Sequence, residues 1–263
     1  MRPVVLSVVI PAYNEENRLG ASLEKIIAYL EDRRRPFELL VVDDGSSDGT
    51  VRTAISAVRD RGREECLRIL ENGANRGKGY SVRRGMLAAR GTHALLTDAD
   101  LSTPIEEVAK LEREMTRGNH QIAFGSRGLT NSRIRKRQSL FRETAGKIFN
   151  LAMRLLTGLP YRDTQCGFKL FELESCRILF RKQRLKNYAF DVEILYLARK
   201  AELAAREVGV IWRHHSDSRI RLLRDGAGLL QGLVSIRWND QLGRYDRDER
   251  DQNRRTTTKG SDS

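Results

Sequence analysis

Two aspartates separated by one residue, Asp98 and Asp100, follow a short apolar segment at 94–96. Carboxylate oxygens are hard ligands of the kind that Mg²⁺ or Mn²⁺ prefers, so this pair is suited to a divalent cation and to phosphates held by that cation. In an ordinary surface loop an Asp-x-Asp sequence would carry no meaning. Its place directly after an apolar, strand-like segment makes it a candidate metal site.

Three earlier apolar segments are followed by polar residues in the same way: Pro11–Glu16, Asp43–Thr50 and Asn75–Gly79. The adjacent carboxylates Asp43 and Asp44 repel each other, and this is tolerated more readily where donors or a cation meet them. A strand-to-helix turn with a capping residue is the simpler alternative for that segment. The glycines of 75–79 allow backbone to approach a ligand closely, and the cations there suit phosphate.

The elements that must position these residues alternate along the chain. Short apolar strands are predicted at 6–10, 39–42, 67–70, 94–96 and 121–124, and helices at 19–30, 50–61 and 103–117. This alternation predicts an α/β fold with a mostly parallel central sheet and helices on both faces. Ligands then bind beyond the carboxyl ends of the strands. In the second half we expect helices over 139–157, 190–200 and 222–242 and a strand over 207–212.

Length and composition exclude several classes of protein. The chain has 263 residues, of which 40% are hydrophobic, which suffices for a substantial core and argues against a coiled coil or a disordered chain. The longest uncharged run, 3–14, has 12 residues, whereas a membrane-spanning helix needs roughly 20. The N-terminus shows no secretory signal pattern, so we expect a cytoplasmic protein. The three cysteines lack the spacing of metal ligands, and we expect them to be reduced thiols.

The positive charge is concentrated in one segment. Residues 1–120 hold 19 basic and 19 acidic side chains, residues 121–245 hold 24 and 11, and 246–263 holds five of each. A basic surface suits nucleic acid, anionic lipid or a phosphorylated substrate, and ordinary solvated helix faces are the alternative. A nucleic-acid-binding surface is expected to interleave aromatic residues with basic ones. Residues 127–147 contain only one aromatic residue, Phe141, so we do not expect this protein to bind nucleic acid. The tail 246–263 has no apolar residue and is predicted to be a disordered polar segment.

Taken in order, these motifs resemble the family 2 inverting glycosyltransferases of GT-A fold. The resemblance is greatest to the dolichyl- or polyprenyl-phosphate sugar synthases, especially the dolichyl-phosphate β-glucosyltransferase branch. It rests on the segments 8–16, 41–50, 75–79 and 98–104, and on three later ones, Phe124–Arg127, Asp163–Phe171 and Phe190–Leu195. The resemblance covers about 5–245. It implies one catalytic GT-A domain over 1–245, with a nucleotide-sugar half at 1–125 and an acceptor half at 126–245.

The resemblance also implies roles for individual residues. The base and ribose of a nucleotide sugar would be bordered by Pro11, Tyr13, Glu15 and Asp43, with Asp44 beside them. Lys78 would approach the diphosphate. Asp98 would lie near the ribose, the phosphates or the metal, Asp100 would be the main ligand of Mg²⁺ or Mn²⁺, and Gln165 would complete the metal site. Arg127 and Arg142 would receive a lipid phosphate.

Two classes of acceptor remain open at this point. A lipid phosphate is already an anion and needs cations to position it, and seven lie within 21 positions: Arg127, Arg133, Arg135, Lys136, Arg137, Arg142 and Lys147. A sugar hydroxyl needs a general base, for which Asp191 or Glu193 is the candidate.

We expect transfer of a hexose from a donor of the UDP-glucose or GDP-mannose type to a polyprenyl or dolichyl phosphate. The alternative is transfer to a hydroxyl of a soluble saccharide or polysaccharide. We place the enzyme at the inner face of an anionic membrane surface, as a peripheral protein, through the basic segment and an amphipathic helix at 139–157. The oligomeric state is left open.

Overall fold

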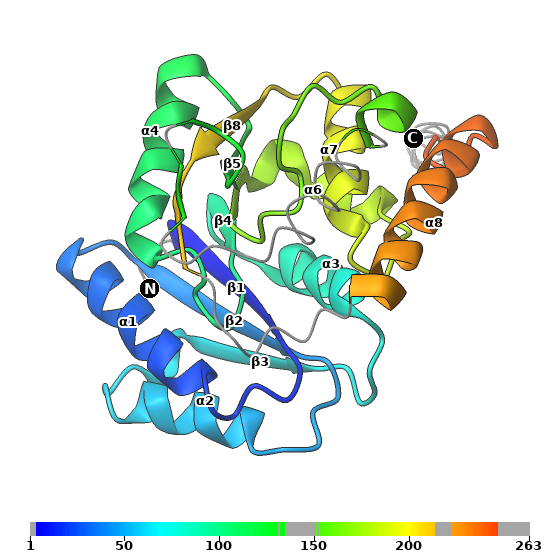
Figure 1. Cartoon of the computed structure of the whole chain (residues 1–263). Coiled ribbons are helices and arrows are strands. Elements are labelled where there is room, and N and C mark those ends of the chain that lie inside the picture. Colours follow the sequence, from blue (N-terminus) through cyan, green and yellow to red (C-terminus); the bar gives the residue numbers. More distant parts are fainter. Residues whose placement is uncertain (1–3, 131, 135–150, 152, 214–221, 247–263) are drawn as a thin grey trace, which may run out of the picture.

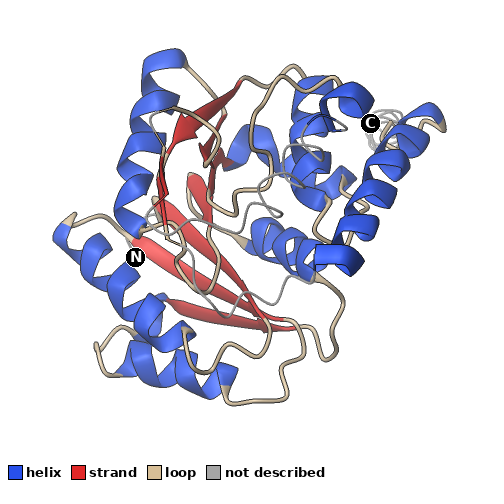
Figure 2. Ribbon diagram, viewed as in Figure 1, coloured by secondary structure: helices blue, strands red, loops and turns tan. Residues whose placement is uncertain are grey.

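A central seven-stranded sheet organises the chain (Figures 1 and 2). A computed structural model describes residues 4–130, 132–134, 151, 153–213 and 222–246. The strand order is β3-β2-β1-β4-β7-β5-β8, and β7 alone runs antiparallel to its neighbours. The strands are β1 (Leu6–Ala12), β2 (Phe37–Asp43), β3 (Leu67–Glu71), β4 (His93–Leu96), β5 (Ile122–Ser126), β7 (Lys169–Glu172) and β8 (Ala205–Gly209). A separate parallel pair joins β6 (Arg133–Ile134) to β9 (Ile211–Trp212).

Helices cover both faces of the sheet (Figure 1). One face is covered by α1 (Leu19–Asp32), α2 (Thr50–Arg59) and α4 (Val108–Gly118). The other face is covered by α3 (Lys78–Ala88), α6 (Leu173–Lys182), α7 (Phe190–Lys200) and α8 (Leu222–Gln241). Short 3₁₀ helices, η1 (Glu64–Cys66) and η2 (Ile105–Glu107), precede β3 and α4. The predicted α/β class and mostly parallel sheet are therefore confirmed.

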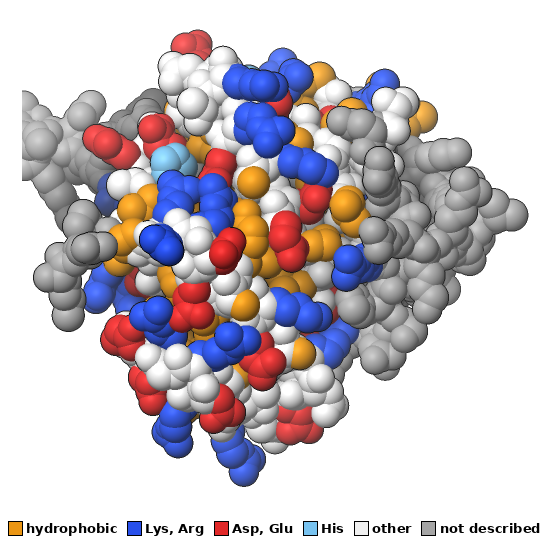
Figure 3. Space-filling view, turned by 90° about the vertical axis from the view of Figure 1, so that its left-hand side faces the viewer, with side chains coloured by type: hydrophobic (Ala, Val, Ile, Leu, Met, Phe, Trp, Pro, Cys, Tyr) orange, Lys and Arg blue, Asp and Glu red, His pale blue; other side chains and the backbone are white. Residues whose placement is uncertain are grey.

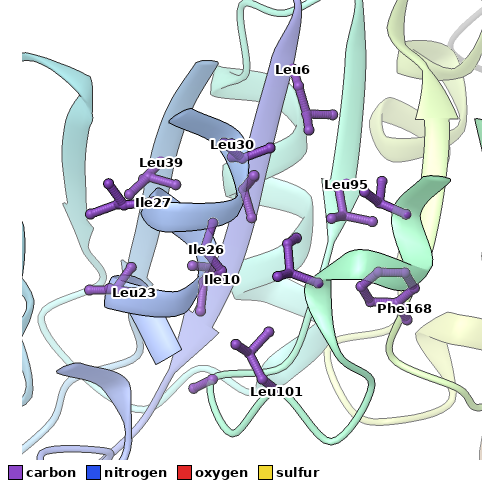
Figure 4. Packing of buried hydrophobic residues seen from close by; sticks show 14 of the residues in the cluster. Leu6, Ile10, Leu23, Ile26, Ile27, Leu30, Leu39, Leu95, Leu101 and Phe168 are labelled. Carbon is purple, nitrogen blue, oxygen red and sulfur yellow. The ribbon is translucent and has the colours of Figure 1, made fainter. Parts of the chain in front are cut away.

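Alternation along the strands divides the core into two layers. In β1, Val8 and Ile10 pack with α1, whereas Val9 between them packs with α3. Successive side chains of a strand point to opposite faces, so a strand that is apolar throughout must be covered on both sides. Figure 4 shows the α1 layer, where Leu23, Ile26, Ile27 and Leu30 lie over strand residues such as Ile10 and Leu39.

The predicted strands all exist, and three described elements of more than three residues were not predicted. They are α3, α6 and β7. β7 begins at Lys169, which is 1% exposed, and a charge at that position breaks the apolar pattern by which a buried strand is recognised. The strand expected over 207–212 is divided into β8 and β9. The helix expected over 103–117 begins as η2 and continues as α4.

Some expectations lie outside the described residues. They include Arg142, most of the helix expected over 139–157, and the tail beyond Asp246. Residues 153–157 are helical. Among the described residues, no helix combines the length and apolar character needed to cross a membrane.

Candidate active site

The loops after β1 and β2 form one interlaced edge. β1 and β2 are parallel neighbours in which Pro11 pairs with Val42 and Ala12 with Asp43, so their carboxyl ends coincide. The Asn14 amide donates to Ser46 Oγ at 2.8 Å, and the Ser47 amide donates to Asn14 Oδ1 at 2.8 Å. These contacts fix the backbone of both loops and bring Tyr13, which is 39% exposed, beside the end of β2.

Asp43 has one satisfied and one unsatisfied carboxylate oxygen. Its Oδ2 accepts the amides of Gly45 and Ser46, each at 3.1 Å. Its Oδ1 is buried and has no hydrogen-bond partner among the described residues. A buried acceptor without a donor is costly, so this oxygen is suited to a ligand that brings an N–H or O–H group.

Both carboxylate oxygens of Asp44, the next residue, accept hydrogen bonds from other parts of the chain. Its Oδ1 accepts Asn72 Nδ2 at 2.7 Å and the Arg76 amide at 3.0 Å, and its Oδ2 accepts the Gly77 amide at 2.8 Å. Both oxygens therefore hold the loop before α3 in place. That Asp44 borders the donor stays a prediction.

The glycines of that loop also serve the protein itself. Gly77 has a left-handed φ of 97°, and a Cβ there would overlap the Lys186 carbonyl oxygen. A Cβ on Gly79 would lie 2.6 Å from the Leu185 carbonyl oxygen. Sequence reasoning linked these glycines to phosphate, but the structure shows that they allow residues 185–187, the segment between α6 and α7, to pack against the loop.

Lys78 and Asp98 form an ion pair at the centre of the edge. Lys78 Nζ lies 2.6 Å from Asp98 Oδ1 and 5.8 Å from the ring centroid of Tyr188. Burial lowers the pKa of Lys78, but the charges of Asp98 and Asp191 outweigh it and leave that pKa above its ordinary value. Burial raises the pKa of Asp98, and Lys78 more than reverses this, so Asp98 is a carboxylate.

A tight turn presents Asp98 and Asp100 together. The Leu101 amide donates to the Asp98 carbonyl at 3.1 Å, and Leu101 has a left-handed φ of 47°, which is uncommon for a leucine. Asp100 Oδ1 accepts the Ser102 amide at 2.9 Å. Asp100 Oδ2 has no partner within the part of the chain that the structure describes.

The segment that carries Gln165 crosses Asp98 directly. A Cβ on Gly167 would overlap the Asp98 carboxylate, so a larger residue at this crossing would displace that side chain. Gln165 donates from its amide to Asp163 Oδ1 at 3.1 Å and from Nε2 to the Tyr188 carbonyl at 3.4 Å. The fold therefore brings the Gln165 segment to the two aspartates.

The donor atoms of this edge fit a hard divalent cation in part. Asp98, Asp100 and Gln165 supply oxygens of the preferred kind. Among the described residues, no group of three or more His, Cys, Asp or Glu side chains could hold a metal by itself. The remaining ligands must then come from phosphate oxygens or water, as is usual for Mg²⁺ at a nucleotide site.

Arg127 is not an unpaired cation. Its Nε and Nη2 lie 2.7 and 2.9 Å from the two carboxylate oxygens of Asp163, and its amide donates to Asp163 Oδ2 at 2.9 Å. The guanidinium also lies 5.5 Å from the Trp212 ring. Burial lowers the pKa of Arg127, and the charge of Asp163 more than reverses this and leaves that pKa above its ordinary value. The sequence did not indicate this partner, although Asp163 begins the segment Asp163–Phe171 on which the family resemblance partly rests.

Asp191 and Glu193 are both buried and engaged within the fold. Asp191, 3% exposed, accepts a hydrogen bond from Lys169 Nζ at 2.5 Å. Burial raises the pKa of Asp191, and the charge of Lys169 lowers it by less, so that pKa stays above its ordinary value. Glu193 accepts the Leu185 amide at 2.9 Å and Tyr245 Oη at 2.7 Å, so it anchors the α6–α7 segment and the end of the described chain. This geometry argues against either residue as a general base.

Glu15 is also engaged. Both of its oxygens accept from Arg18, at 2.8 and 2.7 Å, while its amide donates to Thr50 Oγ1 at 2.7 Å. Its place beside a ribose stays a prediction.

Comparison with solved structures supports the fold. Glucosyl-3-phosphoglycerate synthase of Mycobacterium tuberculosis matches with a TM-score of 0.62 at 20% identity, over 92% of this chain and 81% of that one. Mannosyl-3-phosphoglycerate synthase of Rubrobacter xylanophilus matches with a TM-score of 0.64 at 22% identity, over 92% and 76%. Another structure of the mycobacterial enzyme holds Mn²⁺, UDP and phosphoglyceric acid, and it matches with a TM-score of 0.63 at 19% identity over 92% of this chain and 78% of that one. These likenesses confirm the expected GT-A fold.

Comparison of sequences identifies the family. The dolichyl-phosphate β-glucosyltransferase of Drosophila melanogaster is 41% identical over 82% of this chain and 69% of its own length. The human protein of that name is 35% identical over the same shares of the two chains. The model of glycosyl transferase family 2 matches residues 7–180. The chain therefore belongs to glycosyl transferase family 2 and is a glycosyltransferase, with carboxylates and a lysine gathered at the ends of its strands.

Proposed function

We propose that this enzyme transfers glucose, with inversion, from UDP-glucose to a dolichyl or polyprenyl phosphate. The names of the relatives at 31–41% identity support both the sugar and the lipid phosphate. The UDP bound to a structural neighbour supports the nucleotide. One observation carries the choice between the two acceptor classes: both candidate bases are committed to internal partners, Asp191 to Lys169 and Glu193 to Tyr245.

The donor would bind along the edge formed by the strand ends. The unsatisfied Oδ1 of Asp43 would accept a hydrogen bond from the imide N–H of the base, which removes the cost of a buried acceptor. Tyr13 and Pro11 border the same strand end. Lys78 already lies beside Asp98, and rotation of its side chain would bring its charge to the diphosphate.

A divalent cation, Mg²⁺ or Mn²⁺, would be held by Asp98, Asp100 and the amide oxygen of Gln165. When bound, it supplies positive charge beside the leaving diphosphate. The protein residues add to this: Lys78 stabilises the charge that develops as the bond between the sugar and the diphosphate breaks. An oxygen of the acceptor phosphate forms the new bond from the opposite side of the sugar. Since that oxygen is already anionic, no residue has to remove a proton.

Cations would position the acceptor. Arg127 retains Nη1 for a phosphate beyond its bidentate contact with Asp163. Arg142 stays a prediction because it lies outside the described residues. We expect the enzyme to act as a peripheral protein on the cytoplasmic face of an anionic membrane, where the acceptor phosphate is exposed.

The test is nucleotide release from UDP-glucose and GDP-mannose, each with a short-chain polyprenyl phosphate, the matching polyprenol, or a soluble glucan. We expect UDP release from UDP-glucose with the phosphate only. Arg142→Ala should lower that rate more than tenfold, about 1.4 kcal/mol in the barrier, whereas Arg117→Ala, which removes an exposed arginine of α4, should not. Release with the polyprenol or the glucan at a comparable rate would replace the phosphate acceptor by a hydroxyl acceptor.

A further inference from the structure

Helix α8 and Leu242, the residue that follows it, carry an exposed apolar stripe. Leu230, Val234, Trp238 and Leu242 follow one another at intervals of four residues and are 47%, 57%, 59% and 42% exposed. We call these four residues the α8 stripe. The opposite side of the same helix already packs into the core through Leu233 and Ile236. A helix that only covers a core has a polar outer face, so the α8 stripe needs another explanation.

A second exposed apolar group lies on the segment at 151–157. Leu151, Leu155 and Leu156 are 60%, 77% and 39% exposed. Together the two groups hold seven of the ten large apolar side chains that are exposed among the described residues.

Both groups are attached to the same end of α7. Tyr196 Oη donates to Asp240 Oδ2 of α8 at 2.5 Å, and Arg199 Nη1 donates to the Thr157 carbonyl at 3.4 Å. The two segments that carry these side chains are therefore both joined to α7, at the margin of the molecule where α8 lies in Figures 1 and 2. Large apolar side chains that are exposed on neighbouring segments mark an interaction site.

Positive side chains outnumber negative ones around this region, where Asp240 and Asp246 are both paired with Lys200. Arg154, Arg199, Arg237 and Arg244 are exposed, and none of them forms an ion pair with a described carboxylate. Asp240, the one acidic residue within 228–242, is engaged by Lys200 Nζ and Tyr196 Oη. On the face of the molecule that carries α1 and α2, by contrast, positive and negative side chains are interspersed (Figure 3).

We infer that the α8 stripe, with the apolar residues of 151–157, docks the enzyme on a bilayer that contains anionic lipids. Trp238 and the leucines enter the boundary between headgroups and acyl chains, and the four arginines contact lipid phosphates. A second copy of the chain fits less well, because a symmetric interface would bring this basic surface against the same basic surface of the copy. The inference rests on the proposed function, since a prenyl phosphate acceptor resides in such a bilayer.

The docking surface is linked to the active site through one segment. Asn187 Nδ2 donates to the Gly228 carbonyl of α8 at 3.4 Å, and a Cβ on Gly232 would overlap Ala189. The same segment carries Tyr188 beside Lys78. Helix α8 would therefore lie between a bilayer at the α8 stripe and the segment that borders the donor site.

The test uses the full chain and phosphatidylcholine vesicles with and without phosphatidylglycerol. Wild-type protein should cosediment with the anionic vesicles, less so at high salt. The double variant Val234→Ser/Trp238→Ser should bind at least about tenfold more weakly. Ile55→Ser is the matched control, since Ile55 is 36% exposed on α2, and it should bind as wild type. Circular dichroism and thermal melting establish that all variants are folded.

Tryptophan fluorescence adds a readout at the surface itself. Vesicles should shift the emission of the wild type to shorter wavelength, and Trp238→Phe should abolish the shift while Trp212 remains. Equal vesicle binding by the double variant and the wild type would overturn the inference. So would self-association of the wild type that the double variant loses, in the absence of vesicle binding.

Activity on a water-soluble, short-chain prenyl phosphate separates this inference from the proposed function. Transfer by the double variant at the wild-type rate, together with lost vesicle binding, supports docking as described. Vesicle binding through the α8 stripe without transfer to any prenyl phosphate would leave the docking surface intact and reject the proposed acceptor.

Discussion

Lys169 and Asp191 form a buried ion pair beneath the candidate active site, with Nζ and Oδ1 2.5 Å apart and the side chains 1% and 3% exposed. Lys169 Nζ also donates to the Cys166 carbonyl at 2.5 Å. Through this second contact the pair holds the segment that carries Gln165 and Gly167 against Asp98. It therefore serves to position the metal-site residues.

The first prediction concerns this pair. Asp191→Leu and Lys169→Met should each lower the free energy of unfolding by about 3–5 kcal/mol, because each leaves one buried charge without its partner. The double variant should recover most of that loss, since two apolar side chains need no counter-charge. Urea denaturation of the four proteins measures the coupling.

A conservative substitution of Asp191 distinguishes a positioning role from general base catalysis. Asp191→Asn, which keeps an acceptor oxygen, should lower kcat less than tenfold in protein shown to be folded. A loss of a hundredfold or more with unchanged stability would instead identify Asp191 as a base and favour a hydroxyl acceptor.

The second prediction concerns Asp100. Asp100→Asn should lower turnover about a hundredfold or more with little change in stability, because it removes a charged ligand of the cation and no buried contact of the fold. EDTA should inactivate the wild type reversibly. Mn²⁺ affinity in the presence of UDP, followed by electron paramagnetic resonance, should fall in parallel. Asp32→Asn, at an exposed position outside the site, is the control, and full turnover by Asp100→Asn would refute the assignment.

The third prediction concerns acid stability. Burial raises the pKa of Asp163, but Arg127 more than reverses this and holds that pKa below the ordinary 3.8. A carboxyl whose folded pKa is depressed contributes stability above its unfolded pKa and loses it as the pH falls through the folded value. Asp163→Asn should therefore destabilise the protein by about 2 kcal/mol near neutral pH, a modest value because the side chain of Arg127 is 32% exposed.

Thermal melting at several pH values measures this effect. The difference in melting temperature between wild type and Asp163→Asn should shrink as the pH is lowered below about 4. A difference that stays constant down to that range would show that the charge of Asp163 contributes nothing to stability.

The fourth prediction concerns Gly167. Gly167→Ala should displace Asp98 and weaken Mn²⁺ binding and turnover together, because its Cβ would overlap the Asp98 carboxylate. Gly228→Ala is the matched control, since no atom lies within 4 Å of a Cβ placed there. It should leave activity unchanged and slightly stabilise α8, by up to about 1 kcal/mol. Unchanged Mn²⁺ affinity in Gly167→Ala would contradict the close crossing.

The sequence by itself determined which residues would meet at one edge of the sheet. Apolar segments alternating with helices specify a parallel sheet, and in a parallel sheet all carboxyl ends lie on the same side. Asp43, Lys78, Asp98 and Asp100 directly follow such segments or the turns after them, so their common location could be read without coordinates. The seven-stranded order was less accessible, because Lys169 conceals β7 from any search for apolar runs.

Only the tertiary structure decided which of these charges have partners. Arg127 and Asp163 are 36 residues apart, and Lys169 and Asp191 are 22 apart, so no local spacing relates them. The glycines at 77 and 79 could be assigned to phosphate from their type, yet the backbone at 185–186 occupies the space that they leave. Periodicity reports which face of an element is buried, but a side chain's partner depends on contacts between distant segments, and these exist only once the chain is packed.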